Sequence, residues 1–142
     1  MNGAGPGGDG RGTVLVGIDG SDTSLRAAAY AIGLASRQQY ALTAVYVSDC
    51  YAGPAAGTLI AAGEQTAEDL RGLVSDAIAR TGIQGDFICR SGDVYTELAR
   101  AADEMHADAV IVGQSAKLGY RLAGSVGARL VRNARWLVVV VP

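Results

Sequence analysis

Short apolar runs rich in β-branched residues alternate along the chain with longer segments in which apolar residues recur every three or four positions. Uninterrupted apolar runs of this length are typical of parallel strands that are covered on both faces. The longer segments have the spacing of amphipathic helices. The expected strands are 13–18, 41–47, 86–90, 109–112 and 136–141.

Four amphipathic helices are expected between these strands. Ser21 or Asp22 can cap the first helix and Asp93 the third, because short polar side chains accept hydrogen bonds from the free N–H groups of a first helical turn. The second helix is expected to end at Gly82, and the fourth to span about 126–132. The inner face of the first helix is expected to consist of Leu25, Ala28, Ala29, Ile32 and Ala35. That of the second is expected to consist of Ala67, Leu70, Val74, Ala77 and Ile78, and that of the third of Val94, Leu98, Ala101, Ala102 and Met105.

Strict alternation of strands and helices predicts an α/β fold with a five-stranded parallel sheet between helices and right-handed crossovers. Residues 1–12 contain six glycines and one proline and are expected to form a flexible tail, which leaves 13–142 as a single domain. Residues 49–63, which are also rich in glycine, are expected to form a loop. The sequence contains no internal repeat.

Composition excludes several classes of function. The chain has 142 residues, of which 49% are hydrophobic, and a net charge of −2. Its pI is about 5.2, which argues against a nucleic-acid-binding surface. No apolar run approaches the roughly 20 residues that a membrane span needs. Cys50 and Cys89 have no CxxC spacing, so we expect two buried thiols in a cytoplasmic protein.

The segment 109–126 carries the strongest functional pattern. An expected strand runs into Gly113, a loop follows, and Gly124, Ser125 and Val126 open a helix. A helix N-terminus has free N–H groups and a positive dipole end, which suit a phosphate. Gly17 lies near the end of the first expected strand and Asp19 follows it, so both are expected at the same edge of the sheet, where ligands bind in such folds. The alternative is a strand-to-helix turn in which the glycines and Ser125 have only structural roles.

Segments 16–21, 92–93, 107–113 and 124–141, taken in this order and spacing, resemble the universal stress protein family. The resemblance implies a flavodoxin-like fold, similar to that of the adenine-nucleotide α-hydrolases, with strand order 3-2-1-4-5. It also implies a homodimer. One branch of the family binds ATP, and another branch does not.

The nucleotide-binding branch has a glycine motif that this chain follows in part. Gly113 matches its first glycine, Gly124 its last and Ser125 its hydroxyl residue, whereas Ala116 replaces its second glycine. The stretch between Ala116 and Gly124 is also two residues shorter than in the family, a loss of up to ~7 Å of reach. Lys117 and Arg121 could neutralise phosphates by charge instead. The candidate nucleotide-binding residues are Gly17, Asp19, Leu42, Gly113, Ala116, Gly124, Ser125 and Val126, with ATP and Mg²⁺ as candidate ligands.

No catalytic group or metal-ligand cluster is indicated, because His106 is the only histidine and no serine has a His–acid partner spaced for a triad. Glu97 and Glu104 are expected to face solvent. The apolar strand 138–141 would leave an exposed sheet edge, which a two-fold partner strand could cover. We therefore expect a dimeric, non-enzymatic binding module for an adenine nucleotide, with no nucleic-acid or membrane partner. The alternatives are an interaction protein without a nucleotide, and a weak ATP hydrolase. The sequence identifies no protein partner.

Overall fold

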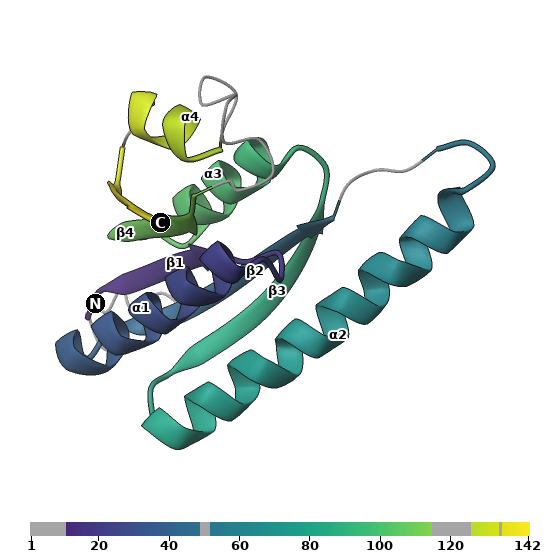
Figure 1. Ribbon diagram of the computed structural model, residues 1–142. Helices are drawn as coiled ribbons and strands as arrows, with labels where there is room; N and C mark the ends of the chain where they lie inside the picture. Colours follow the sequence, from purple (N-terminus) through teal and green to yellow (C-terminus); the bar gives the residue numbers. More distant parts are fainter. Residues whose placement is uncertain (1–10, 49–51, 115–125, 134) are drawn as a thin grey trace.

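A computed structural model of the chain describes residues 11–48, 52–114, 126–133 and 135–142. Strands and helices alternate along these ranges (Figure 1). The strands are β1 (Thr13–Gly17), β2 (Ala41–Ser48), β3 (Gly85–Ser91), β4 (Ala109–Gly113) and β5 (Leu137–Val141). The helices are α1 (Asp22–Gln38), α2 (Ala56–Thr81), α3 (Val94–Glu104) and α4 (Val126–Arg132).

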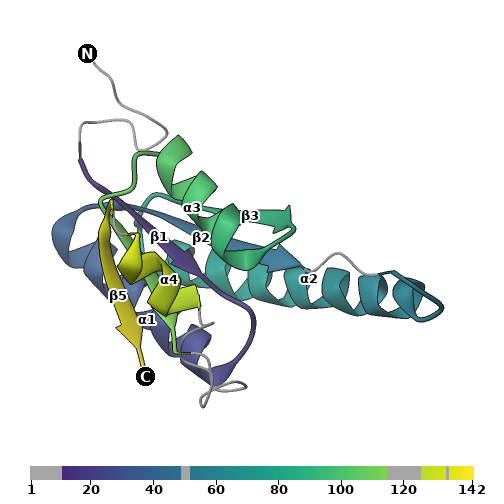
Figure 2. The same cartoon turned by 90° about the horizontal axis from the view of Figure 1, so that it is seen from above.

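The five strands form one sheet in the order β3-β2-β1-β4-β5, and all neighbouring pairs are parallel. Helices α1 and α2 cover one face, and α3 and α4 cover the other (Figures 1 and 2). The chain steps outward from β1 to β3 and then returns to β4 and β5, so right-handed crossovers place the two helix pairs on opposite faces. The predicted fold class and strand order are confirmed.

The two faces of the sheet carry different cores. On the α1 side, Ala27, Ala31 and Ala35 lie against the sheet, and these small side chains let the helix approach it closely. On the α3 side, larger side chains such as Leu98 and Leu130 fill the space. Side chains alternate between the faces along each strand, as the strand geometry requires.

The predicted helix ends are confirmed where they depend on caps. The Ser21 hydroxyl accepts a hydrogen bond from the Ser24 N–H at 3.2 Å at the start of α1. At the start of α3, an Asp93 carboxylate oxygen accepts from the Thr96 hydroxyl at 2.7 Å and from its N–H at 2.9 Å. These hydrogen bonds lower the pKa of Asp93 below its usual value, so the cap is charged at neutral pH. Gly82 ends α2 with a φ of 73°.

Residues 49–63 were expected to form a loop, and this prediction is wrong over 56–63. Helix α2 begins at Ala56 and includes Gly57 and Gly63. A glycine inside a helix costs only about 1 kcal/mol relative to alanine, and the alanines and leucine of this segment favour the helix. The first two turns extend beyond the edge of the sheet (Figures 1 and 2), with Leu59 and Ile60 exposed.

The inner face of α1 is rotated from the predicted one. Leu25 and Ala29 are exposed, whereas Ser24 and Ala27 are buried. The rotation follows from Ser24, because its side chain turns inward to hydrogen-bond with the segment that precedes the helix.

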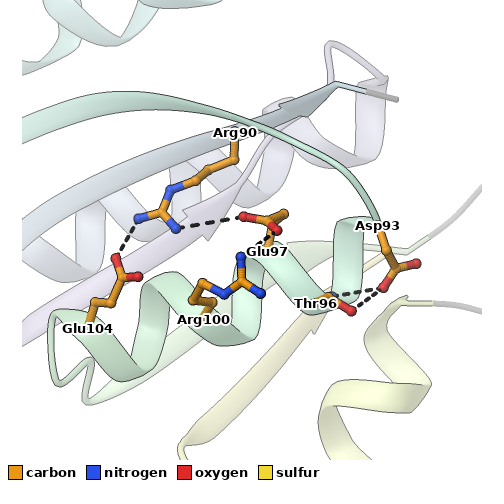
Figure 3. A network of polar contacts seen from close by, with 6 residues as sticks. All are labelled: Arg90, Asp93, Thr96, Glu97, Arg100 and Glu104. Carbon is orange, nitrogen blue, oxygen red and sulfur yellow. Dashed lines mark hydrogen bonds and ion pairs between the residues drawn. The ribbon is translucent and has the colours of Figure 1, made fainter. Parts of the chain in front are cut away.

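Glu97 was expected to face solvent but is only 9% exposed. Its carboxylate lies between Arg100 Nη1 at 3.0 Å and Arg90 Nη1 at 3.7 Å (Figure 3). Both arginines supply the charge that a buried carboxylate needs.

The expectation of buried thiols is also wrong for Cys89, which is exposed on the edge strand β3. Strand β3 is at the edge of the sheet, and its outer part is not fully covered. An apolar run on such a strand does not ensure that each of its side chains is buried, because successive side chains point to opposite faces. Cys50 lies outside the described residues.

Candidate functional site

A pocket of about 180 Å³ opens at the carboxyl ends of β1 and β4. Its walls come from these two strand ends, the end of β2, the turn between β1 and α1, and the first turns of α3 and α4. Strand β1 lies in the middle of the sheet, with β2 on one side and β4 on the other. The chain adds β2 and β3 on the first side and then β4 and β5 on the second, so the direction of strand addition switches between β1 and β4. Such a switch point is where open parallel sheets bind their ligands.

The structure brings four of the predicted site residues together. Gly17, Asp19, Gly113 and Val126 all line the pocket, although they come from three separate segments of the chain. Ala116, Gly124 and Ser125, together with Lys117 and Arg121, lie outside the described residues.

Leu42 does not belong to this group, and its placement in the site is a correction. Leu42 is the second residue of β2 and pairs with Val14, so it is buried near the amino end of the strand. Val45, which pairs with Gly17, and Val47 are the β2 residues that reach the pocket. The predicted residue Leu42 therefore lies too early in the strand to reach this pocket.

A hydrogen-bonded turn holds Asp19 in place. The Ser24 hydroxyl accepts from the N–H groups of Asp19 at 3.1 Å and Gly20 at 3.2 Å, and it donates to the Ser21 carbonyl at 3.0 Å. Asp19 Oδ1 accepts from the Ser21 N–H at 2.9 Å. Asp19 thus has the structural role of a turn residue, and it lines the pocket as well. Sequence analysis missed Ser24, because a second serine after an N-cap resembles an ordinary first-turn residue.

The end of β4 is packed directly under the first turn of α1. A Cβ on Gly113 would lie 2.5 Å from the carbonyl carbon of Thr23 and 2.6 Å from the nitrogen of Ser24. The Thr23 hydroxyl also donates to the Gln114 carbonyl at 2.6 Å. The glycine does allow a close approach, but the group that approaches is the backbone of α1. This packing supports the structural reading of Gly113.

The described walls of the pocket are largely apolar. Val45, Val47 and Leu98 form one side, and Asp19 is the only ionisable residue among the described lining residues. Arg129 of α4 is engaged elsewhere, since its guanidinium lies 4.3 Å from the centre of the Tyr95 ring and 3.5 Å from Asp93 Oδ1. Such a pocket can hold a flat apolar group with one polar edge.

Two further properties can be stated for the described part of the chain. No helix there is long and apolar enough to cross a bilayer. Within the same ranges, no three His, Cys, Asp or Glu side chains gather as metal ligands.

The sheet order and the pocket at its switch point define a flavodoxin-like α/β protein. The sequence model of the universal stress protein family matches residues 10–142. The chain belongs to the universal stress protein family.

Individual relatives agree with this assignment. A universal stress protein of Methanocaldococcus jannaschii is 29% identical over 136 residues, which cover 90% of this chain and 80% of the relative. The crystal structure of a family member from Burkholderia pseudomallei is 29% identical, with a TM-score of 0.79 over 93% of this chain and 96% of the other. A universal stress protein crystallised in complex with cAMP is 27% identical, with a TM-score of 0.76 over 94% of this chain and 99% of the other.

Proposed function

We propose that the chain is a dimeric, cytoplasmic stress-response module that binds an adenine nucleotide in the pocket between β1 and β4. The carrying observation is that Gly17, Asp19, Gly113 and Val126 converge on one pocket at the switch point of the sheet. The related structure with bound cAMP supports the same ligand class. ATP, with or without Mg²⁺, is the first nucleotide to test.

In this proposal the base lies against Val45, Val47 and Leu98, and the Asp19 carboxylate meets a ribose hydroxyl or Mg²⁺. We propose binding rather than turnover, because Asp19 is the only ionisable residue of the described lining and its carboxylate already accepts a hydrogen bond from the Ser21 N–H. Ligand binding would then shift the population of conformations that a partner recognises. Slow ATP hydrolysis is the competing proposal.

Isothermal titration with ATP, with and without Mg²⁺, and with cAMP tests the binding proposal. The variant Asp19→Asn keeps an oxygen for the Ser21 N–H but removes the charge, so we expect about five- to tenfold weaker nucleotide binding. Asp76→Asn, on the exposed surface of α2, is the charge-matched control and should bind as the wild type does. Absence of heat at protein concentrations of tens of micromolar would refute the proposal.

One observation favours an interaction protein without a nucleotide. The pocket measures about 180 Å³, below the roughly 300–1,000 Å³ of typical small-molecule sites. The packing reason for Gly113 agrees with this alternative. Native mass spectrometry separates the two, since a nucleotide-sized adduct on the purified protein would reject the alternative.

The homodimer is proposed from the edge strand β5. Leu137 and Val140 are exposed on this strand, which has a neighbouring strand on only one side among the residues that the structure describes. A two-fold partner strand would cover these side chains and the free backbone groups. Sedimentation equilibrium should give twice the chain mass of 14.5 kDa for the wild type and the single mass for Val140→Lys. Leu73→Lys, at an exposed position on α2, is the control and should stay dimeric; equal masses for both variants would reject this interface.

A further inference from the structure

A second and larger cavity, of about 510 Å³, lies at the opposite end of the sheet from the nucleotide pocket. It opens between the first residues of β2 and β3 and the last turn of α3. Thr43 and Asp86 contribute to it from the sheet, and Glu104 and Met105 from the end of α3. Its volume falls within the range of small-molecule sites. The proposed nucleotide function makes no use of this cavity.

Thr43 is the most buried polar residue among the described lining residues of this cavity. Its residue is 8% exposed, and no hydrogen-bond partner for its hydroxyl lies within the described residues. In the sheet register Thr43 stands between Leu15 and Asp86. Leu15 packs into the core on the α3 side, so Thr43 and Asp86 project from the same face, into the cavity. No fully buried side-chain nitrogen or oxygen in the described ranges lacks a hydrogen-bond partner, so the Thr43 hydroxyl opens into the cavity, where a polar group of a ligand can reach it.

The charged residues that line the cavity indicate which kind of ligand group would bind beside Thr43. Asp86 and Glu104 are the only charged side chains among its described lining residues. Glu104 Oε1 lies 2.6 Å from Arg90 Nη2 (Figure 3), and this hydrogen bond lowers the pKa of Glu104. Asp86 has no such cation within the described ranges, and it is exposed to the cavity opening. Helix α3 also ends here, and its C-terminal end adds a partial negative charge.

We propose that this cavity binds a small organic cation, an alkylamine or diamine, with its ammonium group between Asp86 and Thr43. An ammonium donates hydrogen bonds both to a carboxylate and to a hydroxyl oxygen. Ile88 and Met105 provide apolar surface for the methylene chain. A bare metal ion fits less well, because the cavity is far larger than one ion and the described residues gather no three carboxylate, imidazole or thiol ligands.

Titration of the ¹⁵N-labelled full chain with 1,4-diaminobutane tests the proposal. We expect saturable shifts of the amide signals of Thr43, Gly85, Asp86 and Met105, with the signals of Gly17 and Gly113 unchanged. Because the proposal requires a positive charge, 1,4-butanediol should bind at least tenfold more weakly. The amides of the cavity and those of the nucleotide pocket are observed separately, so a failure of this proposal can be distinguished from a failure of the nucleotide proposal.

Two variants and a matched control sharpen the test. Asp86→Asn removes the charge at nearly constant shape, and Thr43→Val removes the hydroxyl; each should raise the diamine Kd at least threefold. Asp76→Asn removes one charge from the outer surface of α2 and should leave the Kd unchanged. Equal weakening by Asp76→Asn and Asp86→Asn would show diffuse attraction to an acidic protein and overturn the site, as would equal binding of the diol. If Asp86→Asn fails to fold, the Thr43→Val result and the diol comparison decide alone.

Discussion

Replacing Gly113 with alanine is expected to lower the free energy of unfolding by about 2–4 kcal/mol. The added Cβ would lie 2.5 Å from the carbonyl carbon of Thr23 and 2.6 Å from the nitrogen of Ser24. Both atoms belong to the backbone of α1, so no rotamer change can relieve the overlap. The helix has to move away from β4, which would also break the hydrogen bond between Thr23 and Gln114. Urea denaturation of the variant and the wild type measures the difference.

Gly72→Ala is the matched control for this substitution. A Cβ on Gly72 has nothing within 4 Å, and the residue lies inside α2. Alanine is better than glycine in a helix interior, so this variant should gain about 0.5–1 kcal/mol. If Gly113→Ala were as stable as the wild type, the close packing of α1 on β4 would be disproved.

Replacing Leu98 with alanine is expected to lower the free energy of unfolding by about 2–5 kcal/mol. Leu98 is 2% exposed and packs from α3 against the sheet in the core that it shares with Leu15 and Leu130. The lost methyl and methylene groups leave a cavity that a close-packed interior cannot fully collapse. Because Leu98 also lines the pocket between β1 and β4, the variant enlarges that pocket. Urea denaturation gives the magnitude.

Leu73→Ala makes the same chemical change on the surface and serves as the control. Leu73 is 55% exposed on α2, and its truncation should change the free energy of unfolding by less than about 0.5 kcal/mol. Similar losses in the two variants would mean that Leu98 does not belong to the core.

Hydrophobic periodicity was sufficient to predict the alternation of strands and helices and the fold class, because both faces of a parallel sheet must be covered by apolar residues. The strand order came from the family resemblance, since periodicity does not rank strands across a sheet. The start of α2 was missed because Gly53, Gly57 and Gly63 resemble loop residues, although neighbouring helix-favouring residues decide the outcome for two of them. The exposure of Cys89 depends on how much of a sheet edge is covered, which sequence does not report.

The candidate site was predictable in part for the same reason. Asp19 lies just after β1 and Gly113 ends β4, and the carboxyl ends of parallel strands meet at one edge. Leu42 was misplaced because a strand pattern does not say which residue reaches that edge. Ser24 bonds only to nearby residues, but a second serine after an N-cap does not show that its side chain turns inward. Thr43 faces its cavity because of how α3 packs on the sheet, and no local pattern shows this.

The alanines of α1 have a consequence for how tightly a ligand could be held. Ala27, Ala31 and Ala35 have no side-chain torsions that move heavy atoms, so the separation between α1 and the sheet has little rotameric disorder. The turn that carries Asp19 is hydrogen-bonded to the first turn of α1, and this end of the helix packs on β4. That wall of the pocket is therefore pre-organised, and a ligand that contacts it loses little affinity to the ordering of the protein.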